Sequence, residues 1–186
     1  IGKGYHFLEV QFDCDWTATT RDPYFFFLKQ MKNLFSETQI SATIRLHQIK
    51  FMEKTGVPPV DRGMLMAYNM GNLDDIKTEN SILNIETLKS YSKNFDKYPL
   101  ELDVALPIFS WGIVFRDGQA VKIINNLSKK ELLQTPSREN RDFVPQQYET
   151  YFQQNSDNRF VLLKNQYLKG LYLYENDEIR IEDTPL

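Results

Sequence analysis

At residues 7–17 the chain reads FLEVQFDCDWT, an apolar strand that runs into two aspartates and a tryptophan. Side chains alternate between the faces of a strand, so one face carries Glu9, Gln11, Asp13, Asp15 and Thr17. Polar groups on an otherwise apolar strand are costly to bury unless they find partners. We therefore predict that the carboxyl end of this strand opens into a polar site. The alternative is a capped strand end with solvated aspartates.

Strands and helices alternate through the first half of the chain. Further strands are predicted at 40–46, 64–68 and 102–106, where β-branched and apolar residues gather. Asp22-Pro23 is typical of a helix start, and Ser81 is positioned to cap a second amphipathic helix. Such alternation predicts parallel strands joined by helical crossovers. Barrels built in this way carry their chemistry at the carboxyl ends of the strands.

The second half of the chain has a different pattern, with more turns and polar residues. Asp117-Gly118 is a strong turn pair and predicts a hairpin over 111–124. A second hairpin over 171–183 is predicted to turn at Asn176-Asp177, and a short helix is predicted around 145–152. This hairpin-rich half is also the surface we expect to contact any protein partner.

Composition excludes several classes of function. The formal net charge of −3 and the absence of basic runs argue against nucleic-acid binding. Cys14 is the single cysteine, which excludes an internal disulfide and an all-cysteine zinc site. His6 and His47 are far apart and belong to no metal motif, so we expect no metal and no other cofactor.

Three segments resemble strands of the family-18 chitinases, a family of glycoside hydrolases. Residues 10–17 resemble the fourth barrel strand of that family, which carries D-x-x-D-x-D-x-E. MLMAYN at 64–69 is similar to the sixth strand, which ends in M-x-Y-D. ALPIFSWG at 105–112 is similar to the seventh strand, where G-x-P-x-Y-G is common. The order and spacing of these segments agree with the family over about residues 7–112.

The resemblance implies an α/β fold, a (β/α)8 TIM-type barrel of which this chain supplies strands four onward. The earlier strands of the same barrel would precede Ile1. Residues 1–112 would hold barrel strands and helices, and residues 113–186 would complete the barrel with β-hairpin insertions. Chitinase-like barrels of bacterial surface proteins match equally well, which implies an extracytoplasmic or cell-surface location.

The family also implies roles for individual residues. Its final glutamate protonates the glycosidic oxygen, the preceding aspartate orients the acetamido group of the substrate, and its tyrosine helps to hold that group. The resemblance therefore implies Asp13, Asp15 and Tyr68 as catalytic positions. The acid falls at Thr17, whose hydroxyl does not titrate near neutral pH, and Val10 replaces the first aspartate of the motif. The ordinary catalytic acid is therefore missing.

Four further residues are candidates for substrate binding. Trp16 and Trp111 follow predicted strands, where an indole face can stack on a sugar ring; the alternative is packing under a loop. His47 shares a face with Arg45 at the end of the second strand, so the pair can serve as an acid–base group and a charge partner. Asn69 stands where the family has the aspartate that follows its tyrosine.

Charged residues elsewhere are weaker candidates. Asp61-Arg62 precedes the third strand, at the end opposite the expected site, and is predicted to form ion pairs. Asp103 lies within the fourth strand and is a candidate for the barrel lumen.

Three functions follow from these observations. The first is hydrolysis of a glycan with Asp15 in a central role, and the second is glycan binding without catalysis, which the threonine at position 17 favours. The third is a structural or interaction subunit of a bacterial surface assembly. The first two share one partner, a glycan, and the third requires a protein partner instead.

Overall fold

The computed structural model describes residues 7–133 and 151–184. The chain divides into two compact units, and each is described by itself below. The first unit comprises residues 1–68 and 85–106, and the second comprises residues 69–84 and 107–186. The second unit therefore begins a few residues before the predicted division at 112, and it also takes the segment 69–84 from the first half of the chain.

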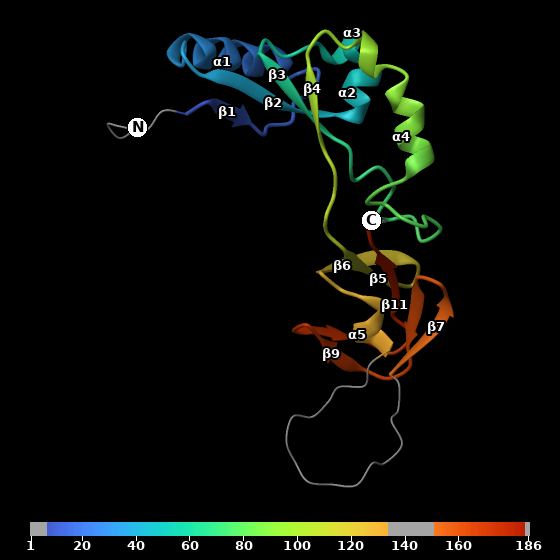
Figure 1. Ribbon diagram of the computed structural model, residues 1–186. Helices are drawn as coiled ribbons and strands as arrows, with labels where there is room; N and C mark the ends of the chain where they lie inside the picture. Colours follow the sequence, from blue (N-terminus) through green and yellow to red (C-terminus); the bar gives the residue numbers. More distant parts are fainter. Residues whose placement is uncertain (1–6, 134–150, 185–186) are drawn as a thin grey trace. The chain divides into compact units, whose positions relative to one another are not determined.

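A parallel sheet forms the centre of the first unit (Figure 1). Its four strands are β1 (Glu9–Phe12), β2 (Gln39–Arg45), β3 (Arg62–Met66) and β4 (Leu102–Ala105), in that order across the sheet. Each strand pairs in parallel with the next one in the chain. The predicted parallel strands are confirmed, close to their predicted positions.

Helices connect these strands and cover one face of the sheet. They are α1 (Arg21–Leu34), α2 (Leu46–Lys50), α3 (Met52–Thr55), α4 (Ile85–Ser92) and the short 3-10 helix η1 (Phe95–Lys97). Leu28 of α1 packs in a core cluster with Ile40 and Ala42 of β2, and all three are fully buried. This burial is the main stabilisation of the α1 face of the sheet.

Both predicted helix starts differ from the structure. Helix α1 begins at Arg21 after Thr20, so Asp22 lies in the first turn rather than at the cap. Its carboxylate is still well placed there, because the amino end of a helix carries partial positive charge. Helix α4 begins at Ile85, and Ser81 does not cap it. Ser81 instead forms hydrogen bonds within the second unit.

The other face of the parallel sheet is polar. The register places Gln11 beside Ser41, Ser41 beside Arg62, and Met64 beside Asp103. Arg62 donates hydrogen bonds to both carboxylate oxygens of Asp103, at 3.2 and 3.1 Å, which supports the predicted ion pairing. The alternation predicted a polar face for β1, and the register shows that polar side chains of β2, β3 and β4 lie on the same face of the sheet.

Asp61 links α1 to the amino edge of the sheet and should make stability depend on pH. It contacts Lys32 and accepts a hydrogen bond from the Ile40 amide at 2.9 Å. Partial burial raises the pKa of Asp61, but the hydrogen bonds from Lys32 and the Ile40 amide together hold it below its usual value. The folded state therefore holds the charged form more strongly than the unfolded state does. The resulting stabilisation is present above about pH 4 and is lost as the pH falls through the folded pKa.

We expect Asp61→Asn to reduce the loss of unfolding free energy that occurs when the pH falls below about 4. Urea unfolding of the parent protein and the variant, at neutral pH and at several acidic values, measures this difference. Asp96→Asn is the control, since Asp96 is an exposed aspartate of η1. If the unfolding free energy of Asp61→Asn falls with pH as steeply as that of the parent protein, Asp61 does not cause the pH dependence.

The second unit is built from antiparallel sheets. The larger has five strands in the order β6 (Gln119–Asn125), β5 (Trp111–Arg116), β11 (Glu178–Glu182), β8 (Arg159–Leu162) and β7 (Phe152–Ser156). The smaller pairs β9 (Gln166–Leu168) with β10 (Leu171–Leu173). Helix α5 (Lys129–Leu133) follows β6, and Leu132 of this helix joins a core that includes Val114, Phe160 and Ile179.

One predicted hairpin is confirmed and the other is wrong. Asp117 and Gly118 turn between β5 and β6 with φ values of 50° and 76°, the left-handed conformation that this turn requires. Asn176, with φ of 69°, lies in the predicted second turn. However, β10 pairs with β9, whereas β11 pairs with β5 and β8. The helix predicted around 145–152 falls mostly outside the described residues.

The fold is therefore mixed α/β, with one parallel sheet and two antiparallel sheets in the described residues. Within these residues the second unit adds no parallel strand to the first sheet, so a closed barrel is not confirmed, and completion of a barrel by residues 113–186 stays a prediction. Within residues 7–133 and 151–184, no helix has the length and apolar character needed to cross a membrane.

Candidate functional site

The carboxyl edge of the parallel sheet gathers residues that the sequence singled out. Asp13 and Asp15 follow β1, Arg45 ends β2, and Tyr68 follows β3. Because these neighbouring strands are parallel, their carboxyl ends lie at one edge of the sheet. This edge is where α/β proteins with parallel sheets place their ligands.

Asp15 and Arg45 form a two-pronged ion pair at this edge. Arg45 Nε donates to Asp15 Oδ1 at 2.5 Å, and Arg45 Nη2 donates to Asp15 Oδ2. The side chains are 50% exposed for Arg45 and 52% for Asp15, so a ligand in solvent can reach both. Planar pairing of a guanidinium with a carboxylate fixes the orientation of both groups. The charge partner of Arg45 in the structure is therefore Asp15, a pairing that the sequence did not predict.

Asp13 is oriented by the neighbouring strand. Thr43, in the middle of β2, is buried and donates its hydroxyl proton to Asp13 Oδ1 at 2.9 Å. The sequence analysis did not identify Thr43. The alternation in β2 could have indicated it, because Ser41, Thr43 and Arg45 occupy successive positions on the polar face.

Trp16 packs in the interior, and its predicted stacking on a sugar is corrected. The indole is only 4% exposed, so it offers no free face to a ligand. It stacks on Tyr24 and meets Phe25 edge-on, each with ring centroids 5.6 Å apart. Trp16 Nε1 donates to the Thr55 carbonyl at 2.8 Å. These contacts anchor the loop that carries Asp15.

Tyr24 lies below the same loop. Burial raises the pKa of the Tyr24 hydroxyl, and electrostatic interactions with Cys14, Asp13 and Asp15 raise it further. The hydroxyl is buried without a hydrogen-bond partner. Tyr24 therefore stays neutral and supports the site by packing.

Two other predicted positions lie in helical surroundings. Thr17 occupies the place of the acid, but its hydroxyl is 2.9 Å from the Thr19 hydroxyl and 3.2 Å from that of Thr20. Its carbonyl accepts the Arg21 amide at 2.9 Å, so Thr17 belongs to the turn that starts α1. His47 lies on α2 and not on the strand, so the predicted shared strand face of Arg45 and His47 is wrong. The His47 side chain is exposed.

The remaining candidates lie at the unit boundary and in the second unit. Tyr68 is half-buried and is the residue at which the first segment of the first unit ends. Asn69 is exposed with φ of 54°, and its amide donates to the Ile82 carbonyl at 2.7 Å. Trp111 starts β5, and its ring centroid is 5.2 Å from that of Phe109. The carboxylate contacts at the sheet edge are those of Asp13 with Thr43 and of Asp15 with Arg45.

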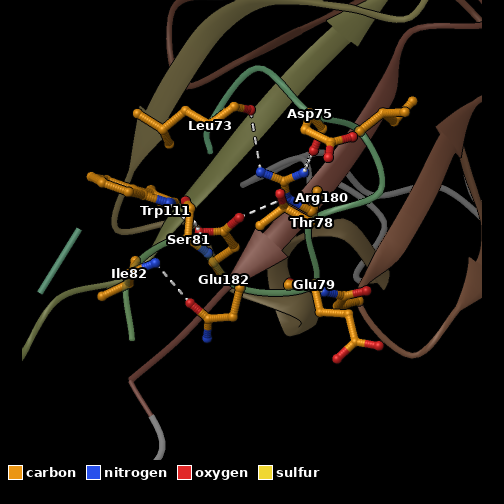
Figure 2. Close-up of polar contacts among 12 residues, drawn as sticks. Leu73, Asp75, Thr78, Glu79, Ser81, Ile82, Trp111, Arg180 and Glu182 are labelled. Carbon is orange, nitrogen blue, oxygen red and sulfur yellow. Dashed lines mark hydrogen bonds and ion pairs between the residues drawn. The ribbon is translucent and has the colours of Figure 1, made fainter. Parts of the chain in front are cut away.

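A buried ion pair organises the second unit, and the sequence analysis missed it (Figure 2). Arg180 and Glu182 lie on β11 with side chains 0% exposed, and Arg180 Nε donates to Glu182 Oε1 at 2.6 Å. The other carboxylate oxygen accepts the Ser81 amide at 2.9 Å, the Ser81 hydroxyl at 2.5 Å and Trp111 Nε1 at 2.9 Å. Both oxygens of the Glu182 carboxylate therefore accept hydrogen bonds, and the bond from Nε1 fixes the orientation of Trp111.

Arg180 also holds the segment 69–84. It donates to the carbonyls of Asp75, at 2.6 Å, and Leu73, at 3.3 Å, as Figure 2 shows. Burial lowers the pKa of Arg180, and the charge of Glu182 opposes this effect. Together the two residues attach the chain that follows Tyr68 to β11.

Metal binding has no geometric support in the described part of the chain. In residues 7–133 and 151–184, no group of three or more histidine, cysteine, aspartate or glutamate side chains is arranged to hold an ion. The chemistry available at the sheet edge is that of carboxylates, a guanidinium and hydroxyls, which bind hydroxyl and amide groups of a ligand.

Comparison with known proteins identifies the fold. No protein-family model matches the sequence, and no curated protein matches it by sequence. A Bacillus subtilis protein described as a sporulation-specific glycosylase, ydhD, matches in structure with a TM-score of 0.53 and 13% identity, over 95% of this chain and 58% of that one. The Bacillus cereus spore cortex-lytic enzyme SleL matches with a TM-score of 0.51 and 16% identity, over 94% of this chain and 38% of that one. The chain therefore has a glycosylase-like fold and spans about half the length of these proteins or less.

Proposed function

We propose that this chain is part of a (β/α)8 barrel of the family-18 chitinase type, and that it binds a glycan at the carboxyl edge of its parallel sheet. The observation that carries the proposal is the exposed pair of Asp15 and Arg45 at that edge. A carboxylate accepts hydrogen bonds from sugar hydroxyls or amides, and a guanidinium donates to their oxygens. One fixed pair can therefore recognise a polar edge of a sugar ring.

The fold likeness and the motifs support the same proposal. The structural neighbours are described as a glycosylase and a cortex-lytic enzyme, so a cell-wall type of glycan is the ligand class we propose. A location outside the cytoplasm, where such glycans are found, belongs to this proposal. Asp15 and Tyr68 stand at the positions that, by the resemblance to the family, would hold the acetamido group of a substrate.

We propose binding rather than hydrolysis as the principal activity. A general acid must carry a proton near neutral pH and must lie within hydrogen-bond reach of the glycosidic oxygen. Thr17 has no such proton, and its hydroxyl faces those of Thr19 and Thr20. Asp15 has both oxygens engaged by Arg45, and Asp13 is engaged by Thr43. These groups suit binding better than proton donation.

Asp15→Ala is expected to weaken glycan binding at least about tenfold, because hydrogen bonds to a charged group contribute about 1.5–3 kcal/mol each. Calorimetry with chito-oligosaccharides and with fragments of spore cortex glycan measures the affinity of the full chain. Asp96→Ala is the matched control, an exposed aspartate that precedes β4. Release of reducing ends from the same glycans tests for hydrolysis.

The outcomes separate the candidate functions. Loss of binding in Asp15→Ala, with Asp96→Ala unchanged and no reducing ends released, supports a glycan-binding site at the sheet edge. If reducing ends are released by the parent protein but not by Asp15→Ala, the function at this edge is hydrolysis and not binding alone. If Asp15→Ala and the parent protein bind the glycan with equal affinity, the binding site does not lie at this edge. Binding to none of these glycans would favour the structural or interaction subunit.

A further inference from the structure

The β9–β10 hairpin of the second unit has one apolar face that packs inward. Its strands are joined by a two-residue turn, Lys169 and Gly170, with φ values of 46° and 80°. Leu173 is 1% exposed in the core of this unit, and Leu168 and Leu171 pack against the same core. Since side chains alternate along a strand, the residues between these leucines face outward.

The outward face carries tyrosines where polar residues are expected. Tyr167 and Tyr172 lie directly opposite in the register, and Tyr174 follows two residues later on the same face. They are 71%, 39% and 49% exposed, respectively. Ring centroids are 4.9 Å apart for Tyr167 and Tyr172 and 5.1 Å apart for Tyr172 and Tyr174. A solvent face made of adjacent aromatic rings is unusual and typically marks a binding surface.

Arg116 extends this tyrosine surface and is held rigidly. Its guanidinium lies 4.3 Å from the ring centroid of Tyr174. Nε and Nη2 of Arg116 each donate to Asp177 at 2.8 Å, and the Asp177 side chain is only 1% exposed. Asp177 also accepts the Tyr174 amide at 2.9 Å. One buried carboxylate therefore fixes both Tyr174 and Arg116.

Two open hollows adjoin the tyrosine surface. One of about 340 Å³ is lined by Arg116, Tyr174 and the polar residues Asp117, Glu175 and Asn176. The other, of about 140 Å³, shares Arg116 and Tyr174 and is lined also by Lys122 and Tyr172. The larger hollow therefore places charged and amide groups beside Tyr174, and the smaller one is lined mainly by apolar residues, including Val121 and Leu171.

We propose that the surface of Tyr167, Tyr172, Tyr174 and Arg116 is a second glycan-binding site, which binds a polysaccharide chain independently of the sheet edge. This inference rests on the proposed glycan-binding function. The C–H groups of a sugar ring pack on tyrosine faces, while its hydroxyls reach the polar lining of the larger hollow. Tyrosine supplies this contact with its own hydroxyl exposed.

The size of the surface favours a glycan over a protein. At the stated exposures the three tyrosines present roughly 350 Å², whereas a stable protein interface needs about 800 Å² from each partner. The exposed area is therefore too small for a stable protein interface, whereas adjacent tyrosine rings with polar neighbours are suited to contact with sugar rings.

The test compares a polymer with short oligosaccharides. We expect Tyr167→Ser/Tyr172→Ser to lower the affinity for polymeric chitin or intact spore cortex glycan about tenfold in a pull-down titration. The affinity of this double variant for short chito-oligosaccharides, measured by calorimetry, should equal that of the parent protein. Leu163→Ser is the matched control, since Leu163 is another exposed apolar residue of the second unit, at 47%. An unchanged urea midpoint shows that the serine variant is folded.

The outcomes distinguish this site from the one at the sheet edge. Polymer affinity that is equal in the parent protein and the double variant overturns the inference, as does a parent protein that binds no polymer. Polymer binding that survives in Asp15→Ala and is lost in the tyrosine variant supports it, even if the sheet edge proves to bind nothing. If light scattering shows that the tyrosine variant loses self-association while its polymer affinity is unchanged, the surface binds a second copy of the chain. This result would overturn the inference.

Discussion

Glu182→Ala is expected to lower the free energy of unfolding of the second unit by about 3–5 kcal/mol, the typical cost of removing one partner from a buried ion pair. The substitution leaves the charge of Arg180 buried, with only main-chain carbonyls as partners. It also removes the acceptor for the Ser81 amide, the Ser81 hydroxyl and Trp111 Nε1. The segment 69–84 should become the first part of the unit to open.

Urea unfolding can follow each unit separately, because the chain has two tryptophans and each unit contains one. A Trp16→Phe background leaves Trp111 as the reporter of the second unit. Asp157→Ala is the control: its side chain is 95% exposed in a pair with Lys129, and such pairs contribute about 1 kcal/mol or less. If Glu182→Ala costs no more than this control, the pair does not stabilise the unit. A cycle with Arg180→Met should show strong coupling between the two residues.

The second large effect is expected from Trp16→Ala, which should cost about 3–5 kcal/mol in the first unit, as buried tryptophan-to-alanine changes usually do. The variant loses the stacking on Tyr24 and the hydrogen bond to the Thr55 carbonyl. Because Asp13 and Asp15 lie on the loop that this indole anchors, the variant should also lose glycan affinity. Stability and binding should therefore fall together.

Trp16→Phe separates packing from hydrogen bonding. It keeps an aromatic ring and loses only the donor to Thr55, so we expect a loss of about 1 kcal/mol. Unfolding followed by circular dichroism in the helical band is suitable, because α1 to α4 all belong to the first unit. Equal costs for the alanine and phenylalanine variants would show that the aromatic stack contributes little.

The sequence predicted those features that depend on neighbouring residues. Strands β1 to β4 were found because apolar and β-branched residues cluster in runs of the right length. The β5–β6 hairpin was found because Asp117-Gly118 favours one turn conformation whatever surrounds it. The pairing of Arg45 with Asp15 was not predicted, although both residues lie at the ends of neighbouring parallel strands. The site prediction was most useful where strand geometry alone positions the side chains.

The errors arose where a distant residue decides the outcome. The local sequence predicts Ser81 as a helix cap. In the structure its amide and hydroxyl instead donate hydrogen bonds to Glu182, which is 101 positions away. The turn at Asn176 is present, yet β11 pairs with strands that the turn does not specify. Trp16 has the same local sequence whether it stacks on a sugar or packs on Tyr24, and only the tertiary contacts with α1 and α3 decide it.

The path of the chain has a consequence for folding during synthesis. The polypeptide passes between the units after Tyr68, after Asn84 and after Leu106, so the first unit is complete before β5 exists. Since earlier parts of a chain generally fold first as they leave the ribosome, β4 can join the parallel sheet while residues 69–84 form a loop without their partners. Those partners, Arg180 and Glu182, lie on β11, the last strand in chain order of those described. The chain that follows Tyr68 should therefore become ordered only after β11 has been synthesised, and a ribosome that stalls before β11 would leave this segment without its partners.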